Sequence, residues 1–157
     1  VVREGRLIPY LQPEGTLKPI FYSALDQKVA LLKLIPGASA ELLRLLLREN
    51  DAVIIESFGV GGLPTDGGYL EAVRRAAEEG KIVVMTTQVQ NEGSDLGVYQ
   101  VGHVLKDVPG VLEAYDMTTE AVLAKLMWAL ACTSQPEEIR RLFYTPISAD
   151  LLGAEQE

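Results

Sequence analysis

Several kinds of residue are scarce in this sequence, and each scarcity excludes a class of protein. Cys132 is the only cysteine among the 157 residues, so no disulfide can form within the chain. No apolar run approaches the roughly 18 to 20 residues that cross a bilayer, so we expect no membrane partner. Residues 1–6 lack the basic-then-apolar order of a secretory signal peptide. Together these absences predict a cytoplasmic protein.

Residues that bind metal ions and basic residues that bind nucleic acids are scarce as well. His103 is the only histidine, and a single imidazole without a second type of ligand nearby is a poor metal site. The chain has 14 lysines and arginines against 22 aspartates and glutamates, a net charge of −8 at pH 7. A surface this acidic repels phosphate backbones, and no stripe of basic residues offsets it. We therefore expect neither a metal nor a nucleic-acid partner.

Composition divides the chain into three parts. Residues 1–25 contain three prolines, which is typical of an extended linker or arm with at most a short strand. Residues 26–150 are long enough for one domain with its own hydrophobic core, and 151–157 are expected to form an acidic tail. Because the chain begins with valine, we interpret it as a fragment or as a chain without its leading residues.

Apolar strands alternate with helices through the body of the chain. Nearly continuous apolar stretches predict strands covered on both faces, at 28–34, 52–56, 81–86 and 110–115. Helices are predicted at about 39–47, 66–79, 98–105, 118–131 and 134–143. This alternation implies a parallel sheet of about four strands with right-handed crossovers. The predicted fold class is therefore a three-layer α/β/α domain, Rossmann-like but without the dinucleotide fingerprint.

Polar residues at the predicted helix starts are typical of caps. We expect Ser39 and Asp66 to cap the first two helices, and Asp116 or Thr118 to cap the fourth. Ser134 and Glu137 fit a capping box for the last.

The helix over 119–131 is apolar on most of its circumference. Such a helix is either a central core element or part of an oligomer contact, in which Met127 and Trp128 would be the anchors. Cys132, which follows it, is expected to be packed rather than reactive.

Small and polar residues follow the predicted strands, where ligands bind in open parallel sheets. Gly59, Gly61 and Gly62 follow the second strand. Pro64 occupies the position of the third glycine of a dinucleotide fingerprint, and no Walker lysine follows. The loop is therefore either a tight strand-to-helix turn or a place where backbone N–H groups approach a ligand or another chain.

Polar residues after the third strand allow two interpretations. Thr86, Thr87 and Gln88 either present polar groups to a ligand or cap the following turn. Glu92 and Asp95 in the next loop either share acid–base chemistry or are simply solvated. No serine lies in a Gly-x-Ser-x-Gly elbow, which excludes an α/β-hydrolase triad.

Four motifs occur in an order typical of one family: Phe-Gly-Val-Gly-Gly-Leu-Pro at 58–64, Val-Val-Met-Thr-Thr-Gln at 83–88, Tyr-Gln-Val-Gly at 99–102, and Asp-Met-Thr-Thr-Glu-Ala at 116–121. From about 27 to 143 the sequence resembles the C-terminal domain of the asparaginase/glutaminase family. It is most similar to the cytoplasmic type I branch.

The resemblance implies a lobe that lacks the catalytic residues. In that family an N-terminal domain carries the threonine nucleophile, whose acyl-enzyme is hydrolysed by water; the family's Thr-Gly-Gly-Thr and Thr-Asp-Thr motifs are absent here. The expected partners are that catalytic domain, a small amino-acid substrate and further copies, in a dimer or tetramer where the C-terminal domain closes a neighbour's active site. No cofactor is implied. The expected pocket or interface residues are Gly59, Gly61, Gly62, Thr87, Gln88 and Glu92.

Two of these residues carry specific expectations. Gly62 occupies a position where the family commonly has an asparagine that contacts the neighbouring site. Glu92 is our candidate for a carboxylate that binds the substrate's ammonium group and helps to orient the amide carbon.

Two other functions fit an α/β lobe. A stand-alone ligand-binding or regulatory module would bind free asparagine without hydrolysing it. A phosphorylated receiver domain would need acidic residues after the first strand and an aspartate at the end of the middle strand. Ile35-Pro36-Gly37 and Thr86-Thr87 occupy comparable positions, which argues against a receiver.

Overall fold

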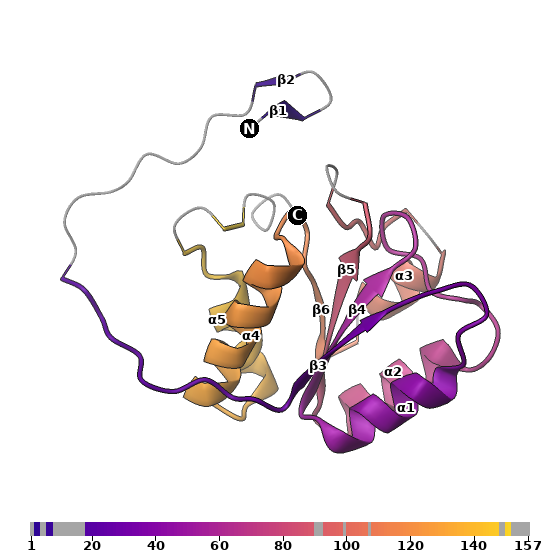
Figure 1. The fold of residues 1–157 in the computed structure, drawn as a ribbon, viewed down its shortest axis with the longest axis horizontal. Coiled ribbons are helices and arrows are strands. Elements are labelled where there is room, and N and C mark those ends of the chain that lie inside the picture. Colours follow the sequence, from indigo (N-terminus) through magenta and orange to yellow (C-terminus); the bar gives the residue numbers. More distant parts are fainter. Residues whose placement is uncertain are drawn as a thin grey trace.

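A four-stranded parallel sheet lies at the centre of the computed structural model, which describes residues 2–3, 6–7, 18–89, 93–98, 100–106, 108–147 and 150–151. The strands follow one another in the order β3 (Val29–Lys33), β4 (Ala52–Ser57), β5 (Ile82–Thr87) and β6 (Val111–Glu113) (Figure 1). Two short strands, β1 (Val2–Arg3) and β2 (Arg6–Leu7), pair antiparallel near the amino terminus.

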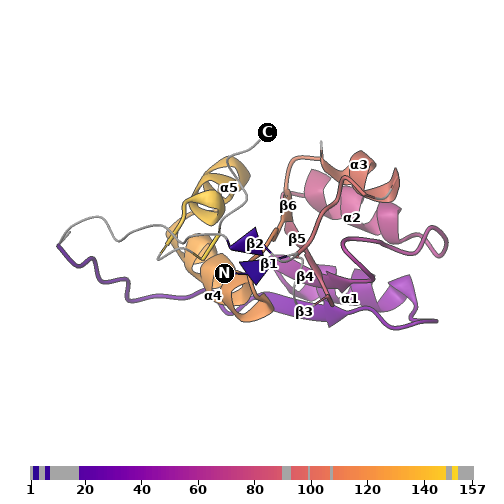
Figure 2. The same cartoon turned by 90° about the horizontal axis from the view of Figure 1, so that it is seen from above.

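Helices cover both faces of the sheet (Figure 2). One face carries α1 (Ala40–Glu49), α2 (Tyr69–Glu78) and α3 (Gln100–Lys106), and the other carries α4 (Thr119–Cys132) and α5 (Pro136–Tyr144). The strand order advances in one direction, so right-handed crossovers put the first three helices on the same face. The chain changes face only after β6. The predicted α/β class with a parallel sheet of about four strands is confirmed.

Alternate residues of the central strand β4 enter two separate cores. Val53 and Ile55 pack against α1 and α2, whereas Ala52 and Ile54 pack against α4 and α5. All four side chains are fully buried. A strand covered on both faces needs apolar residues at every position, which explains its continuous apolar sequence.

Two predicted helix caps are wrong. Gly68, with a φ of 80°, precedes α2 instead of Asp66, and no side chain caps that helix. Gln135 precedes α5 without a side-chain cap bond, so the box predicted from Ser134 does not form. Pro136 begins this helix, where its missing N–H costs nothing.

The other two caps form. The Ser39 side chain accepts the N–H of Glu41 at 3.1 Å, and Thr118 accepts the N–H of Ala121 at 3.2 Å. Thr118 rather than Asp116 therefore caps α4.

Helix α4 is a core element, although one of its ends is exposed. Val122, Leu126 and Ala129 are buried against the sheet, whereas Met127 and Trp128 are half-buried. Cys132, the last residue of the helix, is exposed. The prediction that this cysteine is packed is wrong.

A buried ion pair joins α4 to the segment after α5. The Lys125 side chain is only 3% exposed, and its Nζ lies 2.8 Å from Asp150 Oδ2. Asp150 Oδ1 also accepts the N–H of Ile147 at 2.7 Å. Leu151, the next residue, is buried in the core beneath α4 and α5. The pair thus fixes this segment against the apolar core.

We expect Asp150→Asn to lower the free energy of unfolding by about 3 to 5 kcal/mol, because it leaves the Lys125 ammonium buried without a counter-charge. Lys125→Met combined with Asp150→Asn should recover most of this loss. Urea denaturation of both variants measures the effect. Asp51→Asn is the matched control, because its 3.9 Å pair with Lys28 is exposed and should contribute less than about 1 kcal/mol. Equal effects of Asp150→Asn and Asp51→Asn would contradict the assignment.

The outer edge of β6 is covered by α5. The N–H of Glu113 donates to Tyr144 Oη at 2.8 Å, and the Arg140 guanidinium lies 5.1 Å from the centre of the Tyr144 ring. Burial raises the pKa of Tyr144 to about 12, although the Glu113 N–H and the charge of Arg140 oppose the shift. The buried phenol therefore accepts the N–H of the edge strand in its neutral form at ordinary pH.

The stabilisation by Tyr144 should disappear in alkali. A raised pKa means that the folded state holds the phenolic proton more tightly, so the stabilisation is complete below pH 10 and is lost as the pH rises to about 12. We predict that the difference in unfolding free energy between the native chain and Tyr144→Phe shrinks by about 2 to 3 kcal/mol over this range. Denaturant titrations at several pH values measure it. A difference that stays constant would refute the role of the phenol.

Candidate functional site

A pocket of about 330 Å³ lies at the carboxyl edge of the sheet. It forms where the ends of three strands meet the start of α4, and we call it the carboxyl-edge pocket. Its lining residues are Lys33, Glu56, Thr86, Thr87, Gln88, Val89, Gly93, Asp116, Met117, Thr118, Thr119 and Glu120.

The topology explains why a pocket opens at this edge. After β5 the chain leads to α3 on one face of the sheet, whereas after β6 it leads to α4 on the opposite face (Figure 2). Neighbouring strands whose connections diverge in this way leave a crevice beyond their carboxyl ends, which is where open α/β sheets bind ligands. The position of the pocket therefore follows from the strand order.

A carboxylate held from two sides forms the charged part of the pocket. Glu56 Oε1 accepts the hydroxyl of Thr119 at 2.8 Å, and its Oε2 lies 3.4 Å from Lys33 Nζ. The Glu56 side chain is only 14% exposed, whereas that of Lys33 is 61% exposed. Glu56 is thus fixed in place, while the solvated lysine is held weakly. Adjacent opposite charges of this kind suit a small zwitterion that carries both an ammonium and a carboxylate.

Thr87 and Gln88 brace the pocket through hydrogen bonds to the protein backbone. The Thr87 hydroxyl donates to the carbonyl of Gly59 and accepts the N–H of Val89 at 2.9 Å. Gln88 Nε2 donates to the carbonyls of Leu34 at 2.7 Å and Glu56 at 3.0 Å. These two side chains line the pocket and also tie together the ends of β3, β4 and β5.

The glycine loop forms a tight turn beside the pocket and does not line it. The N–H of Gly62 donates to the carbonyl of Phe58 at 2.9 Å, and Gly59 has a φ of 50°. Gly61 has a φ of 149°, and a side chain there would approach the carbonyl of Asp95 to 3.1 Å. The loop thus packs against the segment after β5, with only Gly59 linked to a lining residue, Thr87. Glu92 lies outside the described residues.

Sequence reasoning missed Lys33, Glu56 and Thr119 of the charged cluster, whereas it identified Thr86 as a polar residue after a strand. Lys33, Glu56 and Thr86 share one register across neighbouring strands, and Thr119 begins α4. The available signal was that Glu56 interrupts the apolar sequence of its strand just before the carboxyl end. This signal identifies a site only when the strand register is known, because the register shows which residues lie beside Glu56.

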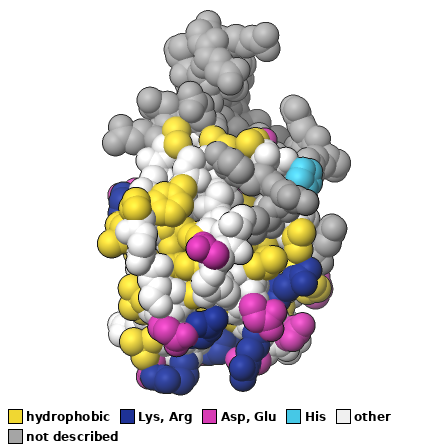
Figure 3. Space-filling model, turned by 90° about the vertical axis from the view of Figure 1, so that its right-hand side faces the viewer, with side chains coloured by type: hydrophobic (Ala, Val, Ile, Leu, Met, Phe, Trp, Pro, Cys, Tyr) yellow, Lys and Arg dark blue, Asp and Glu magenta, His cyan; other side chains and the backbone are white. Residues whose placement is uncertain are grey.

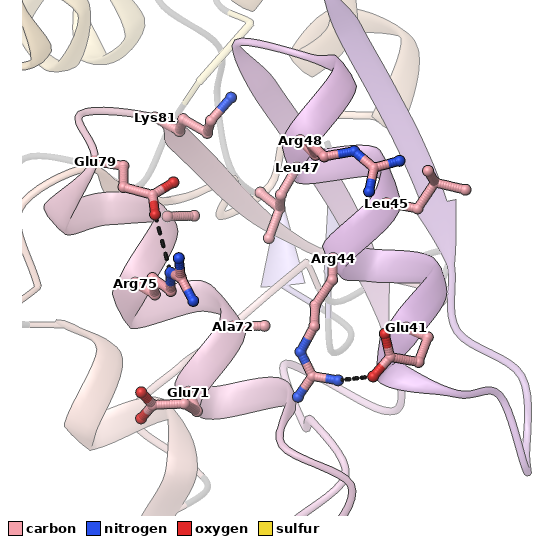
Figure 4. A pocket seen from close by; sticks show the side chains of 11 residues that line it. Glu41, Arg44, Leu45, Leu47, Arg48, Glu71, Ala72, Arg75, Glu79 and Lys81 are labelled. Atoms are coloured by element: carbon pink, nitrogen blue, oxygen red, sulfur yellow. Dashed lines mark hydrogen bonds and ion pairs between the residues drawn. The ribbon is translucent and has the colours of Figure 1, made fainter.

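A second hollow of about 660 Å³ lies between α1 and α2 on the outer surface (Figure 4). Its cations are already engaged: Arg44 pairs with Glu41, Arg75 with Glu79 at 3.0 Å, and Lys81 donates to the carbonyl of Asn50 at 2.8 Å. No residue from a strand's carboxyl end lines it. In Figure 3, cations and carboxylates are interspersed along the lower end of the face, and hydrophobic side chains gather above them. We therefore favour the carboxyl-edge pocket.

Among the described residues, no group of three or more His, Cys, Asp or Glu side chains is arranged to hold a metal ion. Within the same part of the chain, no helix is long and apolar enough to span a membrane.

Comparison with known proteins gives consistent matches. Residues 28–143 match the family described as Glutaminase/Asparaginase C-terminal domain. An L-asparaginase from Thermococcus kodakarensis is 43% identical over 141 residues, which cover 89% of this chain and 42% of the relative. Its solved structure superposes with a TM-score of 0.84 at 40% identity, covering 98% of this chain and 47% of that chain.

Two further relatives show the breadth of the similarity. A glutamyl-tRNA(Gln) amidotransferase component of Pyrococcus horikoshii is 36% identical over 81% of this chain and 28% of its own length. L-asparaginase 1 of Escherichia coli is 31% identical over 88% of this chain and 41% of its own length. The chain therefore spans less than half the length of these curated relatives.

We expect Gln88→Glu to destabilise the chain by about 1 to 3 kcal/mol near pH 7, because a carboxylate of the same shape faces two carbonyl oxygens and cannot donate to them. The loss should diminish in acid, where a protonated carboxyl donates again. Urea denaturation from pH 4 to 8 measures the effect, with Gln135→Glu as the exposed control. A loss that is independent of pH would contradict this bracing role.

Proposed function

The chain belongs to the glutaminase/asparaginase C-terminal domain family, and from this premise we propose that it is the C-terminal lobe of an L-asparaginase. The reaction is the hydrolysis of L-asparagine to L-aspartate and ammonia. The observation that carries the proposal is the 43% identity with an L-asparaginase over 89% of the chain. The identity with the amidotransferase component is lower, at 36% over 81%.

In this proposal the lobe binds and orients the substrate, while a separate N-terminal domain supplies the threonine nucleophile. The charges of the carboxyl-edge pocket support this division. Glu56 is fixed by Thr119 and suits the substrate's ammonium, and Lys33 suits its carboxylate. Holding both groups restricts the amide carbon to the geometry in which the nucleophile attacks. Glu92 remains a second candidate for the ammonium.

The remaining expectations belong to the same proposal. The full-length protein is cytoplasmic and assembles as a dimer or tetramer, with the glycine loop near a neighbouring active site. Gly62 provides no side chain for a hydrogen bond there, so the loop offers only its backbone to that neighbouring site. No cofactor takes part, because the proposed reaction needs only a nucleophile, a proton carrier and water.

A lobe of an amidotransferase is the second candidate, supported by the 36% identity over 128 residues. Such a protein would take part in amide transfer to a glutamyl-tRNA(Gln). A stand-alone module that binds asparagine without hydrolysis is the third. Ammonia release from free L-asparagine distinguishes the asparaginase lobe from the amidotransferase lobe and from the stand-alone module.

The test uses a chimera in which this chain replaces the aligned C-terminal part of the Thermococcus kodakarensis L-asparaginase. We expect the chimera to release ammonia from L-asparagine and the 157-residue chain alone to release none. In the chimera, Glu56→Gln should raise KM about tenfold with a smaller change in kcat, because it removes a binding charge. Glu41→Gln, on the outer surface of α1, is the matched control.

Hydrolysis by the isolated chain at a rate comparable to that of the chimera would overturn the division of labour. Thr119, whose hydroxyl already donates to Glu56, would then be the first nucleophile to substitute. An inactive chimera that still folds would overturn the asparaginase assignment.

A further inference from the structure

The segment that leads into the sheet exposes four large apolar side chains. Residues 18–27, which we call the arm, start away from the domain and come alongside α4 shortly before β3 begins (Figures 1 and 2). Ile20 is 74% exposed, Phe21 90%, Tyr22 58% and Leu25 57%. Single exposed apolar residues are ordinary, but four within six positions form a patch of the kind that marks an interaction surface.

The inner side of the arm is fixed to the domain. The Tyr22 ring meets the Trp128 ring edge-on, with centroids 5.3 Å apart. The N–H of Asp26 donates to the carbonyl of Met127 at 2.9 Å, and the Asp26 carboxylate accepts the N–H of Lys28 at 2.8 Å. Tyr22 and Asp26 therefore anchor the second part of the arm on α4, whereas Ile20 and Phe21 precede these contacts and stay exposed.

Charge is absent from the middle of the arm. Residues 19–25 contain no ionisable group except the phenol of Tyr22, although the chain as a whole carries a net charge of −8. Depletion of charge together with enrichment in aromatic residues is the composition of a buried interface core. The partner surface that fits it is apolar rather than basic.

We propose that the outer side of the arm is the docking surface for the N-terminal catalytic domain, with Phe21 as its central anchor. This inference rests on the proposed function. The position of the arm supports this partner, since the family match begins at residue 28, immediately after the arm. The chain also aligns with only 42% of its L-asparaginase relative. The remaining part of such a protein therefore joins the domain through the arm.

The experiment mixes the 157-residue chain with the separately produced N-terminal domain of the Thermococcus kodakarensis L-asparaginase. Calorimetry measures the affinity. Ile20→Ser combined with Phe21→Ser should weaken binding roughly tenfold or more, because aromatic anchors dominate interface affinity. The matched control is Leu42→Ser with Leu45→Ser, two exposed leucines on α1, on the opposite face of the sheet. It should bind like the native chain, and neither double variant should lower the unfolding free energy of the isolated chain.

Each outcome decides the inference. Equal binding by the arm and control variants, or no binding by the native chain, overturns it. The native chain could also self-associate, and the arm variant could abolish this association. That result would assign the surface to a second copy of the chain and would overturn the inference. Binding that depends on the arm but yields no ammonia upholds the docking surface and refutes the asparaginase proposal. An active chimera whose ammonia release is unchanged by the arm substitutions upholds the asparaginase proposal and refutes the docking surface.

Discussion

The in-register pairing of four parallel strands is the constraint on which the rest of this structure depends. Parallel strands align their carboxyl ends at one edge, so the residues that end each strand become neighbours regardless of their separation in sequence. Here Lys33 pairs in register with Glu56, and Glu56 with Thr86. A shift of one residue would turn Glu56 toward the opposite face and into an apolar core. The buried residues of β4 on both faces exclude such a shift.

The direction of strand order then determines where the sheet is open. Because α1, α2 and α3 all pack on one face, the described residues that cover the opposite face come from the chain that follows β6. Helix α4 begins beside the carboxyl ends of the strands and there places Thr119 against Glu56. The pocket is therefore built by the carboxyl edge of the sheet and the start of α4, which are far apart in the sequence. Gln88 adds the third support by binding the backbone at the ends of β3 and β4.

The parts of this fold that depend on local chemistry could be predicted from the sequence, and the parts that depend on register could not. Continuous apolar stretches identified the strands, since a doubly covered strand tolerates no polar residue in its middle. Thr87 and Gln88 were identified as polar residues after a strand, but their hydrogen-bond partners lie in other strands. The caps expected from Asp66 and Ser134 failed because a cap depends on the path of the loop as well as on the residue. Lys125 interrupts an apolar helix, but this local signal does not identify its partner Asp150, which lies beyond the next helix.

Helix α4 connects the two surfaces that the domain leaves available. Its first residue, Thr119, lines the pocket, and Met127 and Trp128 near its other end hold the arm. Thr119 and Trp128 lie about 13 Å apart along the helix axis. A domain that docks on the arm therefore also presses on the helix that positions the hydroxyl against Glu56. The buried pair of Lys125 with Asp150 lies between these two ends and resists displacement of the helix. In the proposed assembly, docking on the arm and the geometry of the pocket therefore both depend on the position of α4.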